Sequence, residues 1–182
     1  MESTKRHILI TGVPGIGKTT IIRKLAAALK HLHPAGFYTA EIREKGTRKG
    51  FELVGLDGRR GLLAHAEIKS PHSVGKYRVD IQGLEDFLEP ALFMTPATGL
   101  VMIDEIGKME CLSGKFRKMI GEILDSEKIL VAAIALKGTG MIEEIKNRSD
   151  VALFEVTRDN RDSLLAEIVA RILHTYSMKH DV

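Results

Sequence analysis

The stretch Gly12-Val13-Pro14-Gly15-Ile16-Gly17-Lys18-Thr19 decides how this chain is interpreted, because it matches the phosphate-binding P-loop pattern at every required position. Residues 7–11 before it predict a short buried strand, and residues 19–29 after it have the spacing of an amphipathic helix. Glycines let the backbone wrap around a polyphosphate, while the start of the helix adds N–H donors and partial positive charge. The sequence therefore predicts a bound nucleoside triphosphate, with Lys18 reaching its β- and γ-phosphates and the Thr19 hydroxyl ligating Mg²⁺.

Length, charge and cysteine content all suit one enzyme domain. The 182 residues are enough for one sizeable core and few for two, so we expect a single domain over residues 1–182. The single cysteine excludes an internal disulfide, and no Cys/His cluster has zinc spacing. No apolar run approaches the ~20 residues that cross a bilayer, so we expect a cytoplasmic protein without a membrane partner. The net charge of +3 suits a nucleotide or a nucleic acid and does not choose between them.

A β-rich segment follows the first helix. Three short strand-like runs are found at residues 37–43, 51–56 and 60–65. Turn-forming residues at 45–50 and at Asp57-Gly58 separate them. Residues 37–65 are therefore expected to form an inserted antiparallel β-hairpin region.

Beyond this segment the pattern alternates helices and strands. Helical spacing is found at residues 84–92, with a kink expected at Pro90, and then at 116–124, 141–146 and 164–173. Thr157 is the candidate N-cap of the last helix. Apolar runs of the kind found in central strands lie at 100–103, 129–135 and 151–156. The fold class is therefore α/β, with a mostly parallel sheet covered by helices on both faces.

The acidic pair Asp104-Glu105 closes the apolar run at residues 100–103. In P-loop proteins an acidic residue at the end of a buried strand holds Mg²⁺, and Asp104 is the candidate for that role. Glu105 is placed to orient an attacking water and to accept its proton. A base beside the metal ligand favours hydrolysis over transfer to an acceptor hydroxyl.

A second motif pair points toward small GTPases and has to be weighed. Residues 104–107 also spell Asp-x-x-Gly, and residues 147–150 (Asn-Arg-Ser-Asp) loosely imitate the guanine-reading motif. The latter precedes a strand instead of following one and has Arg in place of Lys. We therefore interpret residues 147–150 as the end of a helix and a turn.

Several basic residues have more than one interpretation. Lys108 can reach a γ-phosphate or remain a solvated side chain. Arg43 and Arg48 lead a cluster that also contains Lys49, Arg59 and Arg60, and that can supply an arginine finger, bind RNA, or keep a sheet edge soluble. Residues 160–162 (Asn-Arg-Asp) can contact the base or ribose, or begin the last helix.

With these residues in hand, the chain resembles the P-loop nucleoside-triphosphatases of the thermophile type, whose vertebrate members are called cancer-related nucleoside-triphosphatase. The resemblance covers nearly the whole chain. The segments that carry it, besides the P-loop, are residues 36–39 (Gly-Phe-Tyr-Thr), 41–43, 50–51, 74–77, 103–110 (Ile-Asp-Glu-Ile-Gly-Lys-Met-Glu) and 157–162. It implies a RecA-like fold and slow, Mg²⁺-dependent hydrolysis of ATP, GTP and other nucleoside triphosphates.

Residue by residue, the resemblance implies nucleotide binding by two segments. They comprise Gly12, Val13, Pro14, Gly15, Ile16, Gly17, Lys18, Thr19 and Thr20 in the first, and Leu100, Val101, Met102, Ile103, Asp104, Glu105, Ile106 and Gly107 in the second. The stretch 135–138 after the strand at 129–135 departs from what family members often carry and receives no catalytic role.

The function expected from the sequence is a nucleoside-triphosphatase with Lys18 and Glu105 as catalytic residues and Thr19 and Asp104 as Mg²⁺ ligands. Two alternatives remain: a P-loop kinase for a nucleoside, nucleotide or RNA end, and a nucleotide-controlled binding module. The sequence leaves open whether a nucleic acid is a partner, and it does not give the oligomeric state.

Overall fold

The computed structural model describes residues 5–89, 93 and 95–180. Its strands are β1 (His7–Thr11), β2 (Ala35–Glu44), β3 (Thr47–Gly55), β4 (Arg60–His65), β5 (Ser73–Val74), β6 (Tyr77–Val79), β7 (Leu100–Ile106), β8 (Ile129–Ile134) and β9 (Val151–Glu155). Its α-helices are α1 (Lys18–Ala28), α2 (Ile81–Phe87), α4 (Gly114–Asp125), α5 (Met141–Lys146) and α6 (Arg161–His180), with short 3₁₀ turns at Lys30–Leu32 and Glu110–Leu112. The kink expected at Pro90 lies outside the described residues.

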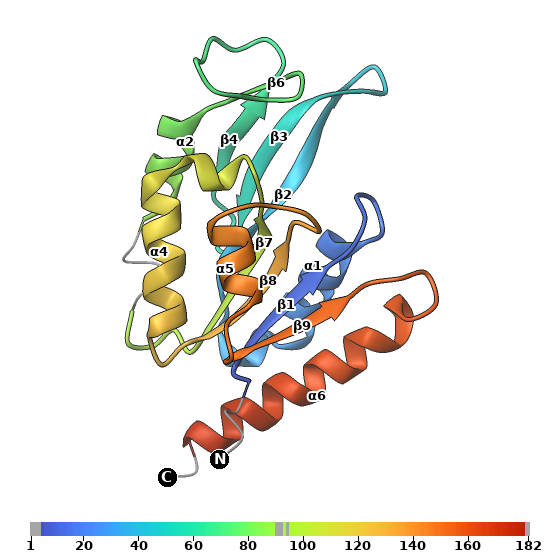
Figure 1. Ribbon diagram of the computed structural model, residues 1–182, viewed down its shortest axis with the longest axis vertical. Helices are drawn as coiled ribbons and strands as arrows, with labels where there is room; N and C mark the ends of the chain where they lie inside the picture. Colours follow the sequence, from blue (N-terminus) through green and yellow to red (C-terminus); the bar gives the residue numbers. More distant parts are fainter. Residues whose placement is uncertain (1–4, 90–92, 94, 181–182) are drawn as a thin grey trace.

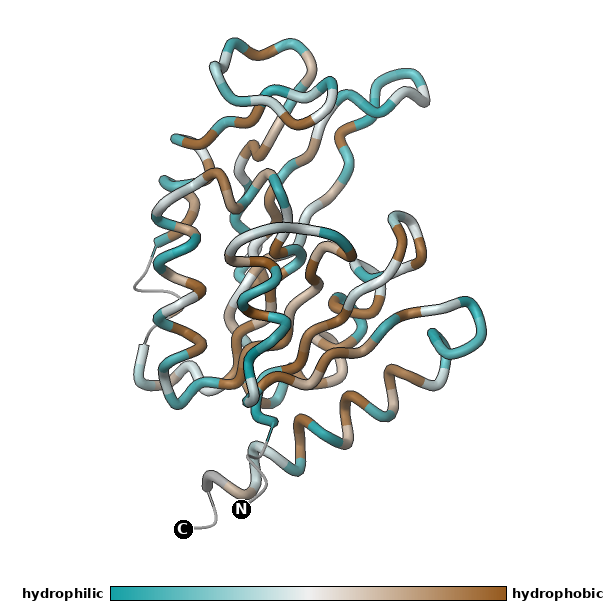
Figure 2. Tube along the Cα trace, viewed as in Figure 1, coloured by the Kyte–Doolittle hydropathy of each residue, from teal (hydrophilic) through white to brown (hydrophobic). Residues whose placement is uncertain are grey.

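Within the described residues the strands form one nine-stranded sheet in the order β5-β6-β4-β3-β2-β7-β8-β1-β9. The half that contains β2, β7, β8, β1 and β9 is parallel. Its strands are apolar on both faces because helices cover both: α1 and α6 pack on one face, and α4 and α5 on the other (Figures 1 and 2). The α/β P-loop architecture expected from the sequence is thus confirmed.

The β-rich insertion extends the same sheet. At Ala35–Phe37, β2 pairs in parallel with β7, and from Phe37 onward it pairs with β3 in the antiparallel direction. Gly36 allows β2 to approach β7 closely, since a Cβ atom there would lie 1.7 Å from the Met102 carbonyl oxygen. The β5–β6 hairpin was not foreseen and completes the insertion. The sheet is therefore mixed, with its antiparallel half built from the insertion.

Two expected boundaries differ from the structure. The turn expected at residues 45–50 is only Lys45-Gly46, both at positive φ (47° and 80°), so the next strand already begins at Thr47. Helix α6 begins at Arg161 and not after Thr157. Thr157 instead accepts a hydrogen bond from the Asn160 backbone N–H (3.3 Å) and caps a separate turn before the helix.

Candidate functional site

The P-loop connects the end of β1 to the start of α1. Gly15 and Gly17 adopt positive φ (78° and 114°), which a residue with a side chain rarely does. No side chain caps the first turn of α1, and that turn contains no acidic residue. Its free N–H groups and partial positive charge therefore remain available to an anion.

Lys18 joins the loop to the acidic pair at the end of β7. Its Nζ donates a hydrogen bond to the Gly12 carbonyl oxygen (3.0 Å) and lies 3.8 Å from Glu105 Oε2. Its side chain is only 10% exposed, whereas that of Glu105 is 34% exposed. A cation and a carboxylate thus flank the mouth of the loop, and both retain some access to solvent.

Asp104 is the most buried charged group of the site. It is 2% exposed and accepts a hydrogen bond from the Thr19 hydroxyl (2.6 Å, to Oδ2) and a longer one from the Thr39 hydroxyl (3.5 Å, to the same oxygen). The pKa of Asp104 is raised to about 6, chiefly by burial and also by the nearby Glu105 charge, while the Thr19 hydrogen bond and the Lys18 charge oppose the rise. In the described part of the chain, no Lys or Arg forms an ion pair with Asp104.

These oxygen donors fit a magnesium ion. Mg²⁺ takes oxygen ligands and is usually held by one or two protein groups together with substrate phosphates. The Thr19 hydroxyl and the buried Asp104 carboxylate supply such a set, and a cation there would neutralise a carboxylate that otherwise lacks a contacting positive charge.

Behind Glu105 the chain turns at Gly107 and reaches a second buried acid. A Cβ atom on Gly107 would lie 2.7 Å from Glu105 Oε1 and 2.9 Å from Glu110 Oε2, so both carboxyl groups crowd this position. Burial raises the pKa of Glu110 to about 8, with the Glu105 and Asp104 charges acting in the same direction. Thr39 and Glu110 belong to segments that carry the family resemblance, but no local pattern in the chain assigns either residue a role at the site.

The apolar residues of β7 have a positioning role. Leu100, Val101, Met102 and Ile103 are fully buried in the sheet. Their side chains are buried in the sheet, and nucleotide binding by the segment 100–107 stays a prediction. What they do is fix the end of β7, and with it Asp104, at the carboxyl edge of the sheet.

The candidate arginine fingers are bound elsewhere. Arg43 Nε and Arg48 Nη1 donate to opposite oxygens of Glu41 (2.7 and 2.8 Å), and Arg48 Nε also donates to the Tyr77 hydroxyl (2.9 Å). The structure therefore keeps both arginines within the insertion, whereas Lys108 is exposed beside the site.

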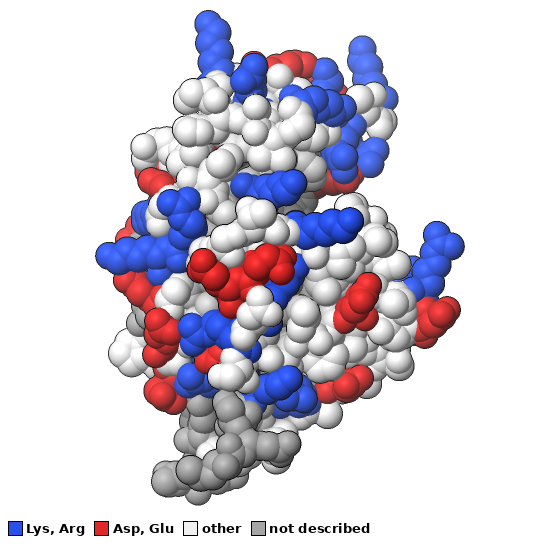
Figure 3. All heavy atoms as spheres, viewed as in Figure 1, with Lys and Arg blue, Asp and Glu red and all other residues white. Residues whose placement is uncertain are grey.

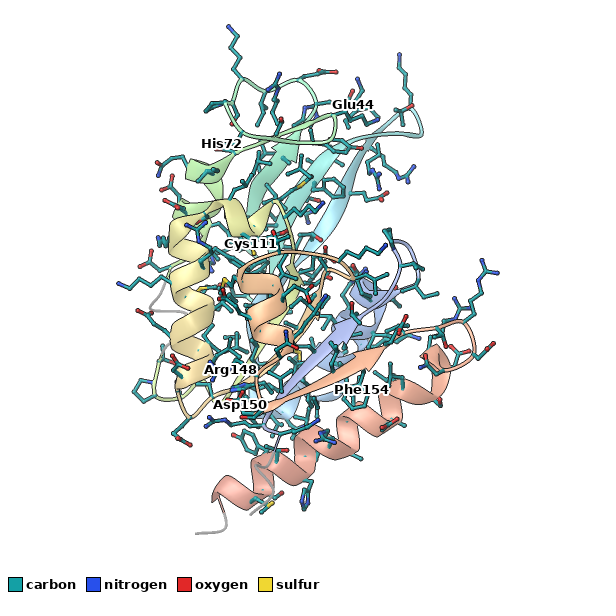
Figure 4. The ribbon with its side chains drawn as sticks, viewed as in Figure 1. Glu44, His72, Cys111, Arg148, Asp150 and Phe154 are labelled. Carbon is teal, nitrogen blue, oxygen red and sulfur yellow. The ribbon has the colours of Figure 1, made fainter. Side chains whose placement is uncertain are left out.

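The motif at residues 147–150 is part of a structural cluster. Arg148 is bound to Asp150 through two hydrogen bonds of 2.9 Å and to Asp125 at 3.0 Å, and the Asp150 carbonyl oxygen accepts from the His7 backbone N–H (3.0 Å). His7 is the first residue of β1, whereas the P-loop follows the last residue of that strand. The cluster therefore lies at the amino ends of the parallel strands, opposite the site (Figure 4). The helix end and turn expected here are confirmed.

Comparisons with known proteins show what the chain is similar to. The model of a family described as NTPase matches residues 7–169. Nucleoside-triphosphatase THEP1 of Thermotoga maritima is 47% identical over 167 residues, covering 90% of this chain and 93% of that protein. The human cancer-related nucleoside-triphosphatase is 39% identical over 180 residues, covering 90% and 95%. Among solved structures, THEP1 of Aquifex aeolicus superposes with a TM-score of 0.80 at 31% identity, covering 91% and 98%.

Proposed function

The chain belongs to this NTPase family, and on that basis we propose that it is a nucleoside-triphosphatase that hydrolyses nucleoside triphosphates to the diphosphate and phosphate. The observation that carries the proposal is the meeting of Lys18 and Thr19, at the start of α1, with Asp104 and Glu105, at the end of β7. The groups proposed to bind phosphate and to activate water come from distant parts of the sequence, and these contacts bring them together.

We propose that the triphosphate lies along the P-loop with its γ-phosphate toward Glu105. The free N–H groups at the start of α1 bind phosphate oxygens, and Lys18 exchanges its hydrogen bond to Gly12 for the β- and γ-phosphates. Thr19 and Asp104 are the proposed ligands of Mg²⁺, which when bound neutralises phosphate charge. Thr39 is proposed to orient Asp104 through their shared hydrogen bond.

Glu105 is the proposed general base. It is partly exposed, so a water molecule can reach its carboxylate from the solvent side of the P-loop. In hydrolysis the water oxygen forms a bond to the γ-phosphorus, the bond to the leaving diphosphate oxygen breaks, and Glu105 accepts the proton of the water. Lys18, 3.8 Å from Glu105, is placed to stabilise the negative charge that develops on the phosphate.

Phosphate release from ATP, GTP, CTP and UTP, measured with and without candidate acceptors, tests this function. We expect release from all four without an acceptor, and a spread in kcat/KM below about 100-fold, because phosphate and metal contacts discriminate bases weakly. Loss of release in Lys18→Ala would tie the activity to this site. Nucleoside diphosphate formation that requires an acceptor would instead support a kinase.

A further inference from the structure

The positive charge of the protein is concentrated in the insertion. Residues 37–79 contain nine Lys or Arg and five Asp or Glu, a net charge of +4, whereas the whole chain carries +3. The remainder of the chain therefore has a slight negative excess. Figure 3 shows the contrast: Lys and Arg dominate the end that the insertion forms, while the two signs mix on the rest of this face.

Five of the nine cations already form ion pairs, with four carboxylates between them. They are Arg43 and Arg48 on Glu41, Lys49 on Glu67, Arg59 on Asp57 and Arg60 on Glu52. These pairs run along β2, β3 and β4 and suit the interpretation of a charged, soluble sheet surface.

The other four cations form what we call the basic tip: Lys45, Lys69, Lys76 and Arg78. All four are exposed, and none pairs with a carboxylate in the described part of the chain. Lys69 and Arg78 line a surface hollow of about 500 Å³ together with Ile68, Ser70 and Pro71, and no acidic residue lines it. Glu44 directly precedes Lys45 in the chain, and Figure 4 shows it in the upper part of the insertion, on the other side from His72.

The hollow of the basic tip is too far from the P-loop to serve the bound nucleotide. Arg78 of the hollow lies on β6, and β6 and β1 are separated by five strands. Six inter-strand spacings of ~4.8 Å put the hollow on the order of 30 Å from the P-loop. A nucleoside triphosphate in the P-loop does not span that distance, so the unpaired charge points to a second, separate anionic ligand.

The spread of the charges indicates what that ligand is. A hollow lined by two cations suits one phosphate group, while Lys45 and Lys76 add exposed positive charge elsewhere on the insertion, which suits a ligand with several phosphates. Tyr77, the aromatic residue of the β5–β6 hairpin, is only 6% exposed and offers no face for stacking on a base. We propose that the basic tip binds the phosphodiester backbone of a nucleic acid, without sequence preference.

Salt-dependent RNA binding tests the proposal. The probe is a fluorescently labelled 20-nucleotide poly(U) RNA, whose affinity is measured by anisotropy from 25 to 200 mM NaCl. The variant Lys69→Ala/Arg78→Ala removes the two cations of the hollow, and the control Lys30→Ala/Lys118→Ala removes two exposed lysines outside the insertion. Thermal unfolding and NTP hydrolysis of both double variants are expected to match the wild type, because none of these residues belongs to the nucleotide site.

We expect the slope of log K against log [NaCl] to be shallower by about 1.4 for Lys69→Ala/Arg78→Ala, because each lost phosphate contact removes about 0.7. The slope of the control variant should match that of the wild type. Equal losses in both variants, or no RNA binding by the wild type at 25 mM NaCl, would overturn the proposal. So would binding of an acidic peptide at the tip in preference to RNA. If the protein still hydrolyses nucleoside triphosphates under any of these three outcomes, the RNA proposal fails while the proposed enzymatic function is retained.

Discussion

Asp104→Asn is expected to stabilise the metal-free protein and to abolish its response to Mg²⁺. Burial raises the pKa of Asp104 from 3.8 to about 6, so the folded protein holds this proton more tightly than the unfolded chain does. Ionisation of Asp104 therefore costs stability progressively as the pH rises from about 4 to about 6. A rise of about two pKa units corresponds to about 3 kcal/mol at pH 8. Asparagine has nearly the same shape, carries no charge, and can still accept the hydrogen bond from Thr19.

Urea unfolding in EDTA at pH 5 and pH 8 measures this effect. The variant should be more stable by up to about 3 kcal/mol at pH 8, and by about half as much at pH 5, where the folded wild type is largely protonated at this site. The exposed Asp159→Asn should show no such pH-dependent gain. With MgATP the melting temperature should rise for the wild type but not for Asp104→Asn. A variant less stable than wild type at pH 8, or a gain identical at both pH values, would refute the reasoning.

Substitutions at four further positions test individual contacts. Thr39→Val should raise the Mg²⁺ concentration needed for nucleotide binding about 10-fold or more, because it removes the hydroxyl that donates to Asp104. Thr39→Ser keeps that hydroxyl and should bind as the wild type does in fluorescent-nucleotide titrations. Equal behaviour of the two variants would show that the Thr39 hydroxyl has no role at the site. Gly107→Ala should lower kcat with little change in KM, because its Cβ would lie 2.7 Å from Glu105 Oε1; an unchanged kcat would mean that the base tolerates displacement. Arg43→Ala and Arg48→Ala should leave kcat unchanged, because a single carboxylate holds both arginines away from the site. A fall of tenfold or more in phosphate release would show instead that the insertion closes over the nucleotide.

Local patterns were enough to predict strands β1, β7, β8 and β9 of the parallel half of the sheet. The bounds of β1 and of α5 agree with the expected segments. The ends of a short strand before a P-loop and of a six-residue helix are determined by residues close by in the sequence. The β5–β6 hairpin was missed because strands of two and three residues carry no usable alternation. That the insertion joins the central sheet was also not foreseen, since it depends on the long-range contact of Gly36 with β7.

The site could be predicted from the sequence only where its functional residues are neighbours along the chain. The P-loop and the Asp104-Glu105 pair were found this way, and the structure brings Thr19 and Asp104 into hydrogen-bond contact. Thr39 and Glu110 were not found, because their proximity depends on how β2 and the turn after β7 fold in space. The pairing of Arg48 with Glu41 is likewise a contact between two strands that residue type alone does not reveal.

The central claim is that Glu105 activates water for hydrolysis of a nucleotide held by the P-loop. Single-turnover phosphate release from MgATP by Glu105→Gln tests it most directly, since glutamine keeps the shape of the side chain but cannot accept the proton. The account predicts a rate lower by roughly 10²–10⁴-fold, with MgATP affinity retained. Release at the wild-type rate would contradict it.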